Sequence, residues 1–196
     1  MNNRAEFRQK HAQQKRNTTL AVVIGLGLMA LAVVLFINMP KAGFPVSTQV
    51  LSTIPVEVNY QAPALALENT KGKTESLADF HDKVVLVNNW ATWCPPCKAE
   101  MPTLVDFYNE HAKDGLMIVA IEAGESKDQV QEFADLYKMP FSVWVDPDGK
   151  SLNAFKNGNL PNSYVIDRTG TVRLMWTGEI NRETLEKYVT PMLAKN

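Results

Sequence analysis

Cysteine and histidine are scarce in this chain. Its 196 residues include two cysteines and three histidines, too few for a disulfide-rich scaffold and a poor set for a structural zinc site, which needs four ligands. Basic residues are not in excess either, because 20 Lys and Arg stand against 21 Asp and Glu. A nucleic-acid-binding protein normally carries a basic stripe, so this balance argues against nucleic acid as a partner. No glycine-rich phosphate loop is visible, and we expect neither an organic cofactor nor a metal.

The charges are unevenly distributed along the chain. Residues 1–17 contain five basic residues and one acidic residue, a net charge of +4, whereas the remainder carries a net charge of −5. Between these zones, residues 20–37 form a run of 18 consecutive apolar or glycine residues. At about 1.5 Å per residue, the range 18–39 spans roughly 33 Å, enough for a bilayer core of about 30 Å. We favour an uncleaved transmembrane anchor over a signal peptide, whose apolar region is usually about 7–15 residues.

The charge difference also predicts an orientation. Positive residues that flank a first membrane helix tend to stay in the cytoplasm, so residues 1–17 are expected to form a cytoplasmic basic arm. Residues 40–60 contain three prolines and no helical periodicity, which is typical of a tether. The alternating segment Val56-Glu-Val-Asn-Tyr60 is also compatible with a short strand. We therefore expect a folded domain at 61–196 on the outer, oxidising side of the cell membrane, where a cysteine pair can form a disulfide.

The hydrophobic pattern of this domain alternates between strands and helices. Strands are predicted at 83–90, 116–121 and 141–145, with an antiparallel pair at 162–167 and 171–176 and a small hairpin over 64–74. Helices are predicted at 95–113, 126–137 and 182–190, and Pro191 should end or kink the last of them. Strands that alternate with helices and end in a hairpin indicate a mixed α/β sheet covered on both faces.

Both cysteines belong to one motif at the junction of a predicted strand and a predicted helix, Trp90-Ala-Thr-Trp-Cys-Pro-Pro-Cys97. Cys94 takes the N-cap of the helix and Pro95 its first position, where the missing N–H costs little. A thiol at a helix N-terminus has a lowered pKa, so thiolate is present near neutral pH. We expect the Cys94 thiolate to attack a partner disulfide and Cys97 to resolve the mixed disulfide.

Three other interpretations of the cysteine pair remain open. Half a zinc site would need two further ligands, and the domain offers only His81 and His111, in unhelpful contexts. A purely structural disulfide would close a very small loop and constrain little. A peroxidase would need one peroxidatic cysteine, and nothing favours that over a paired motif. A redox-active dithiol is the interpretation that we favour.

Three segments carry a resemblance to a known family. They are the run W-A-T-W-C-P-P-C-K-x-E-x-P, the segment Gly124-Glu-Ser126, and Leu160-Pro-Asn-Ser-Tyr-Val-Ile-Asp167. Over about residues 61–190 the chain resembles the thioredoxin superfamily and, within it, the membrane-anchored TlpA/ResA/CcmG-like thiol–disulfide oxidoreductases. The resemblance implies a thioredoxin-like mixed sheet flanked by helices, preceded here by one N-terminal transmembrane helix.

The resemblance also implies roles for particular residues. Pro161 matches a cis-proline beside the cysteines, which leaves the carbonyl before it, that of Leu160, open for pairing with a substrate backbone. Glu100 matches an acidic residue of the family, and it lies three residues beyond Cys97 on one helix face, in position to exchange a proton with that thiol. The alternative for Glu100 is a solvated helix residue. Glu122 is a weaker candidate.

We expect substrates to dock on a surface formed by the apolar residues around the motif, namely Trp93, Pro95, Pro96, Leu160 and Pro161. Two departures from the family pattern put the carry-over of substrates in doubt. Asn89 stands where an aromatic residue is usual, and Asn162-Ser163 stand where threonines are common.

The two prolines between the cysteines predict a direction for the redox reaction. Pro95 and Pro96 have no N–H group, so only Cys97 and later amides are left to stabilise a thiolate at Cys94. This predicts a more reducing dithiol than a Cys-Gly-Pro-Cys version would give.

These observations together favour an outward-facing reductase of disulfides in exported proteins. By resemblance, such substrates are apocytochrome c haem-attachment motifs or proteins of metal-site assembly, and electrons come from a membrane thiol relay of the CcdA or DsbD kind. The alternatives are a net disulfide oxidase or isomerase, a thiol peroxidase-type antioxidant protein, and a non-catalytic thioredoxin-fold chaperone or scaffold.

Overall fold

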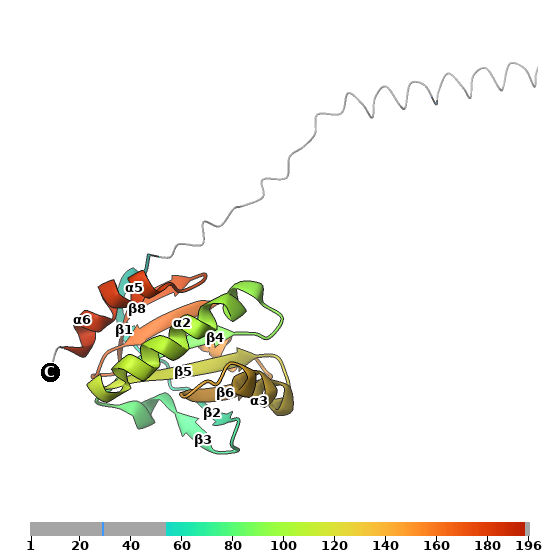
Figure 1. The fold of residues 1–196 in the computed structure, drawn as a ribbon, viewed down its shortest axis with the longest axis horizontal. Helices are drawn as coiled ribbons and strands as arrows, with labels where there is room; N and C mark the ends of the chain where they lie inside the picture. The colour runs from blue at the N-terminus through green and yellow to red at the C-terminus, as the bar shows by residue number, and fades with distance from the viewer. Residues whose placement is uncertain (1–28, 30–53, 195–196) are drawn as a thin grey trace, which may run out of the picture. The chain divides into compact units, whose positions relative to one another are not determined.

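The computed structural model describes residues 54–194 and, in the N-terminal part of the chain, Met29 (Figure 1). The arm predicted at 1–17, the anchor predicted at 18–39 and most of the tether predicted at 40–60 therefore lie outside the described residues, Met29 excepted. Within the described part, no helix is both long and apolar enough to span a bilayer.

One mixed sheet of eight strands forms the centre of the domain, in the order β1-β8-β7-β4-β5-β6-β2-β3. The strands are β1 (Val56–Gln61), β2 (Ala66–Asn69), β3 (Thr74–Ser76), β4 (Val84–Trp90), β5 (Leu116–Ala123), β6 (Ser142–Asp146), β7 (Asn162–Ile166) and β8 (Thr171–Thr177). β5 runs parallel to its neighbours β4 and β6, and the other pairs are antiparallel. The mixed α/β sheet expected from the sequence is confirmed.

Helices cover both faces of this sheet. They are η1 (Leu77–Phe80), α2 (Pro95–His111), η2 (Ala112–Asp114), α3 (Lys127–Leu136), α4 (Lys150–Ala154), α5 (Arg182–Tyr188) and α6 (Thr190–Leu193). Residues of α2, α3 and α5 pack in one hydrophobic cluster, while η1 and the residue after α4, Phe155, pack in a second cluster on the other face. All seven residues of β4 are buried between them, as the uninterrupted apolar pattern predicts for a strand covered on both sides.

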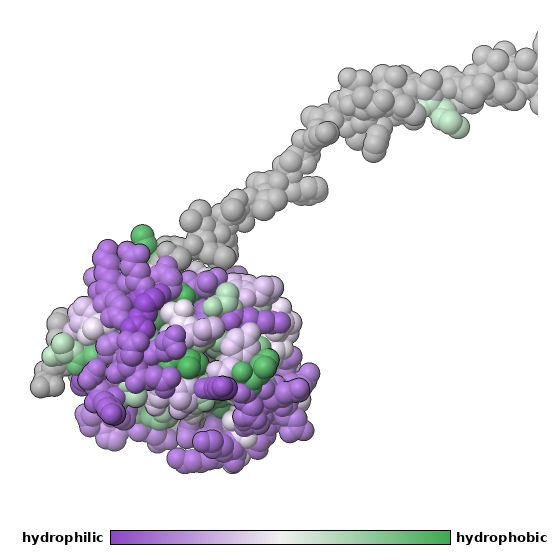
Figure 2. All heavy atoms as spheres, in the orientation of Figure 1, coloured by the Kyte–Doolittle hydropathy of each residue, from purple (hydrophilic) through white to green (hydrophobic). Residues whose placement is uncertain are grey.

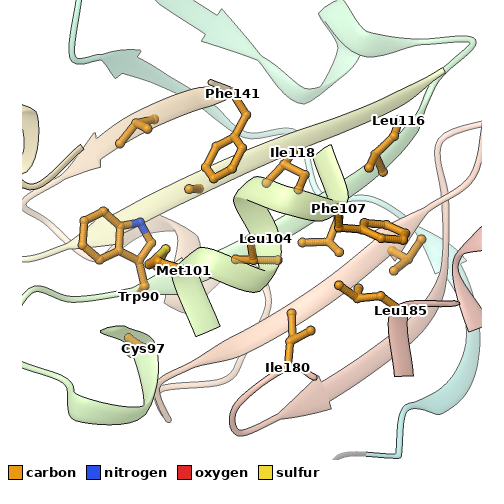
Figure 3. Packing of buried hydrophobic residues seen from close by; sticks show 14 of the residues in the cluster. Trp90, Cys97, Met101, Leu104, Phe107, Leu116, Ile118, Phe141, Ile180 and Leu185 are labelled. Carbon is orange, nitrogen blue, oxygen red and sulfur yellow. The ribbon is translucent and has the colours of Figure 1, made fainter. Parts of the chain in front are cut away.

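The first cluster fixes the position of α2, the helix that begins between the cysteines (Figure 3). Cys97, Met101, Leu104 and Phe107 recur at helical spacing, and all four are fully buried. Figure 3 shows these side chains along the inner side of α2, facing Ile118 and Leu116 of the sheet. On the outer face seen in Figure 2, hydrophilic residues predominate and hydrophobic residues form small, separate spots.

Two parts of the fold differ from the sequence-based prediction. The range 56–60 was predicted as the end of a tether with a short strand as the alternative, and it belongs to strand β1, because this segment pairs with β8 from Val56↔Met175 to Gln61↔Thr171. Most of its side chains are exposed, so the strand is held by the backbone ladder at a sheet edge and not by a buried face. Helix α4 was not predicted, since its five residues are too few to show a period.

Candidate active site

The cysteine pair sits where β4 ends and α2 begins. Cys94 is the N-cap of α2 in extended conformation, and the structure is the oxidised form, with a Cys94–Cys97 disulfide and a Cα–Cα distance of 5.3 Å. The Cys97 N–H donates to Cys94 Sγ at 3.3 Å. Cys94 is 4% exposed and Cys97 is fully buried, so an incoming sulfur reaches Cys94 first. The helix-cap position predicted for Cys94 is confirmed.

The five residues predicted to form a docking surface differ in exposure. Trp93 is 66% exposed and Pro95 is also exposed, whereas Pro96 and Leu160 are half-buried and Pro161 is buried. The Leu160–Pro161 peptide bond is cis, as the resemblance implied. Leu160 packs against the same cluster that contains both cysteines. Trp93, Pro95, Pro96 and Leu160 are therefore the members of this group that a partner protein can contact.

Glu100 lies inside the protein beneath the start of α2. Its side chain is fully buried, so the alternative of a solvated helix residue is wrong. Its Oε1 accepts a hydrogen bond from Asn88 Nδ2 and its Oε2 accepts one from the Ile180 N–H, both at 2.8 Å. Burial raises the pKa of Glu100 to about 8, and these two hydrogen bonds oppose the rise only in part. The carboxyl is therefore largely neutral at pH 7 and close to the point of ionisation.

A second buried carboxyl, Glu122, lies at the end of β5 and pairs in register with Trp90. Burial raises the pKa of Glu122 to about 8, and its contact with the Glu125 carboxylate adds to the rise. The Glu125 carboxylate in turn accepts hydrogen bonds from Thr92 N at 3.1 Å and Thr92 Oγ1 at 2.6 Å. Glu122 and Glu125 thus hold the loop that leads into Cys94.

The sequence singled out Glu122 only weakly and did not assign Glu125 a role. Glu125 was part of the segment Gly124-Glu-Ser126 that carried the family resemblance, and that was its only signal. Asn88 was also missed, because a polar residue inside a run of valine and leucine has no local signature of its partner.

The two departures from the family pattern are bonded to each other. β4 and β7 pair with Asn88 opposite Ser163 and Asn89 opposite Asn162. Asn88 Nδ2 donates to Ser163 Oγ at 3.0 Å, and Asn89 Nδ2 donates to Asn162 Oδ1 at 2.8 Å. The residues that depart from the family pattern are therefore joined to β4 by buried cross-strand hydrogen bonds, Asn162 to Asn89 and Ser163 to Asn88.

A cavity of about 920 Å³ lies away from the cysteines. Its lining includes Val84, at the opposite end of β4, together with Arg173 and Lys187. None of the residues predicted for the active site lines it. The cavity is therefore separate from the redox chemistry.

Among the described residues, one group of three side chains has atoms close enough to hold a metal ion, namely Glu110, His111 and Glu186, whose ligand atoms lie within 4.8 Å of one another. The Arg182 guanidinium donates hydrogen bonds to both carboxylates of this group. The Arg182 guanidinium thus already neutralises the two carboxylates that a cation would need as ligands, and the group does not fit a metal site.

The comparisons with known proteins agree with this geometry. The model of the AhpC/TSA family matches residues 58–175. The chain belongs to the AhpC/TSA family. It is 32% identical to "Thiol-disulfide oxidoreductase ResA" of Geobacillus kaustophilus over 157 residues, which cover 80% of this chain and 90% of that protein. It is 37% identical to the protein of the same name from Bacillus subtilis over 128 residues, 65% of this chain and 72% of that one.

Among solved structures, the domain is similar to a putative thiol:disulfide interchange protein DsbE from Chlorobium tepidum. The TM-score is 0.67 at 27% identity, over 71% of this chain and 99% of that one. With the cysteine pair at the N-terminus of α2, these relatives make this AhpC/TSA family member a thiol–disulfide oxidoreductase with a thioredoxin-like fold.

The buried Glu122 predicts a pH dependence of stability. Between its ordinary pKa near 4.5 and its native pKa of about 8, the folded protein keeps a proton that the unfolded chain has released. Stability therefore falls as pH rises through this window, by at most about 1.4 kcal/mol per pH unit. Glu122→Gln, which has no such proton, should be more stable than the parent at pH 7 and should lose the contribution of Glu122 to the slope, while Glu100, whose pKa is also about 8, keeps its own contribution.

Urea unfolding of the oxidised protein at pH 5, 6, 7 and 8 measures the effect. The same chemical change at the exposed Glu132 on α3 serves as the matched control. Unfolding free energies of the parent and Glu122→Gln that run parallel across this range would contradict the assignment of a neutral carboxyl.

Proposed function

We propose that this protein reduces disulfide bonds in exported proteins. The observation that supports reduction over oxidation lies at the N-terminus of α2. Pro95 and Pro96 occupy the first helical positions there, and only the Cys97 N–H reaches Cys94 Sγ. A thiolate at Cys94 thus receives one backbone hydrogen bond where an N-cap ordinarily has two donors within reach. Weak stabilisation of the thiolate disfavours the reduced form and makes the dithiol a better reductant.

The proposed reaction transfers two electrons from the Cys94–Cys97 dithiol to the substrate disulfide, and the two substrate thiols formed take up two protons. The Cys94 thiolate attacks one sulfur of the substrate disulfide, forming a mixed disulfide and releasing a substrate thiolate that takes up a proton. Cys97 then loses its proton and attacks Cys94 Sγ, which closes the Cys94–Cys97 disulfide and releases the second substrate thiolate, which takes up the second proton. Glu100, with a pKa of about 8, accepts the Cys97 proton in this second step.

The surface around Cys94 supports docking of a polypeptide. Trp93, 66% exposed, offers an apolar contact directly before the nucleophile. Within the described part of the chain, no backbone hydrogen bond involves Leu160. Its peptide groups are therefore open to pair with an extended substrate segment, as a strand added beside the active site.

We further propose that the domain works outside the cell membrane, held by an anchor at 18–39 with residues 1–17 in the cytoplasm. The 18-residue apolar run and the change from +4 to −5 across it support this orientation. Substrates are then oxidised cysteine pairs of exported proteins, such as apocytochrome c or metalloprotein assembly factors. A reductase on the oxidising side needs electrons from the cytoplasm, which a membrane thiol relay of the CcdA or DsbD type supplies.

Trapping tests the proposed function. Cys97→Ser retains the nucleophile but lacks the resolving thiol, so it should accumulate mixed disulfides between Cys94 and a few exported proteins. Non-reducing electrophoresis followed by mass spectrometry identifies them, and Cys94→Ser is the matched control that traps nothing. A double serine variant that still supports maturation of the trapped proteins would overturn catalysis in favour of a scaffold.

Replacing one of the two prolines should change the thiol pKa of Cys94 and the reduction potential of the cysteine pair. Pro96→Ala restores an N–H at the second helical position, so it should lower the Cys94 thiol pKa and make the reduction potential less negative. Pro95→Ala is the control, because an N-cap side chain accepts from the second and third helical amides and not from the first. Thiol titration and equilibration with glutathione measure both quantities. A parent potential close to that of a strong oxidant would refute the reductase assignment.

Glu100 predicts the pH profile of the resolving step. Below its pKa of about 8 only a fraction of Glu100 is ionised, so the rate of Cys97 attack should rise about tenfold per pH unit and level off above pH 8. Glu100→Gln should be slower by about 100-fold at pH 7 and should lose the inflection near pH 8. Stopped-flow release of a thiol from a preformed mixed disulfide measures the step. An unaltered profile in Glu100→Gln would remove Glu100 from the proton transfer.

A further inference from the structure

A buried chain of hydrogen bonds links helix α4 to the segment that precedes Pro161. Ser151 Oγ donates to Asn89 Oδ1, and Asn89 Nδ2 donates to Asn162 Oδ1 at 2.8 Å. Asn162 Nδ2 then donates to the Asn159 carbonyl at 2.6 Å and to the Asn157 carbonyl at 3.4 Å. This series of hydrogen bonds thus runs from helix α4 through strands β4 and β7 into the connection between α4 and β7.

Ser151, Asn89 and Asn162 are all fully buried. Their side-chain polar atoms are all bonded within the described residues, since Asn89 and Asn162 each use both the oxygen and the nitrogen of the amide. Buried amides contribute little net stability compared with apolar groups of the same shape, but they fix geometry, because each bond has a preferred distance and direction. The arrangement is therefore suited to positioning a backbone.

The backbone that it positions is the edge of the active site. β7 runs antiparallel to β4, so the residues before Asn162 lie beside those that follow Asn89 and lead to Cys94. Leu160, in the segment held by Asn162, packs against the cluster that includes both cysteines. Asn159 itself is exposed, and the other end of the segment is held by Asn157 Nδ2, which donates to Thr177 Oγ1 of β8 at 3.0 Å.

The hydrogen bonds at Asn89 are separate from the proton chemistry at Glu100. Successive residues of a strand point to opposite faces of the sheet. Asn88 points to the α2 face, where it donates to Glu100, and Asn89 points to the α4 face, where it bonds Ser151. A change at Asn89 or Asn162 therefore leaves the Glu100 hydrogen bonds in place.

We propose that Asn89 and Asn162 are positioning residues that set substrate preference, by fixing residues 157–160 as a template for an extended polypeptide beside the disulfide. The inference rests on the proposed function as a reductase of protein disulfides. The template should therefore improve binding of disulfides within a peptide chain. It should not improve binding of small disulfides, which have no backbone to pair with it.

The test compares two substrates in the full-length protein. One is a synthetic twelve-residue peptide with an internal Cys-Ala-Ala-Cys disulfide, and the other is hydroxyethyl disulfide. The main variant is Asn89→Leu combined with Asn162→Leu, which replaces both partners by apolar groups of similar shape and so avoids leaving one buried amide unpaired. Ser151→Ala removes only the outermost bond, and Asn153→Ala, on the exposed side of α4, is the matched control.

In the double variant we expect KM for the peptide to rise about tenfold with kcat within about twofold, and the rate with hydroxyethyl disulfide to be unchanged. Amide hydrogen exchange at Asn159 and Leu160 should accelerate. Ser151→Ala should show a smaller change in the same direction, and Asn153→Ala none. Retained reactivity with the small disulfide serves as the check that the variants are folded.

Two results would overturn the inference alone: a peptide KM that does not change in the double variant, or an equal loss with both substrates. A parent protein that reduces hydroxyethyl disulfide but not the peptide would overturn both the inference and the proposed function, so the two failures are distinguishable.

Discussion

Strand β4 is buried along all seven of its residues, and the polar side chains near its end must find every partner inside the protein. Asn88 and Asn89 find partners on opposite faces of the sheet, one through Glu100 and Ser163 and the other through Ser151 and Asn162. Asn89 uses both amide atoms, whereas Asn88 uses its nitrogen and leaves Oδ1 without a partner among the described residues. Because an unpaired buried amide is costly, these bonds determine where the neighbouring segments lie. The start of α2 and the entry to β7 thus take their positions from the same short stretch of strand.

This arrangement places two neutral carboxyls near a disulfide that is almost out of solvent. Glu100 lies on the α2 side, close in sequence to Cys97, and Glu122 lies behind the loop that leads into Cys94. The two differ in their surroundings. Glu100 accepts hydrogen bonds from two uncharged donors, Asn88 and the Ile180 N–H. Burial raises the pKa of Glu100 and the charge of Glu179 adds to the rise, so Glu100 is suited to move a proton. Glu122 contacts the carboxylate of Glu125 and is suited to hold a loop.

The local sequence predicted the parts of the fold that show a hydrophobic periodicity or a recognisable motif. Long apolar strands such as β4 and β5 and the α2 helix were predicted closely, since burial on one or two faces imprints a pattern on neighbouring residues. The cysteine pair was predicted because the chemistry depends on a spacing of three residues. Glu100 was predicted by family resemblance, and its full burial explains why a local pattern alone left it ambiguous.

The remaining features depend on contacts between distant residues. The Asn89–Asn162 bond joins positions 73 residues apart, and Glu125 holds Thr92 across 33 residues. A single sequence contains no trace of such partners. Strand β1 was predicted as the end of a tether with a short strand at 56–60 as the alternative, because its side chains are mostly exposed and its stability comes from backbone pairing with β8.

The edge position of β1 has a mechanical consequence. Any load on the chain ahead of residue 54 enters the domain at Val56, the first pair of the β1–β8 ladder. Between β1 and β4 lie the strands β8 and β7 (Figure 1). Strand β1 therefore stands first in line for such a load, and β8 and β7 separate it from β4 and the cysteine motif.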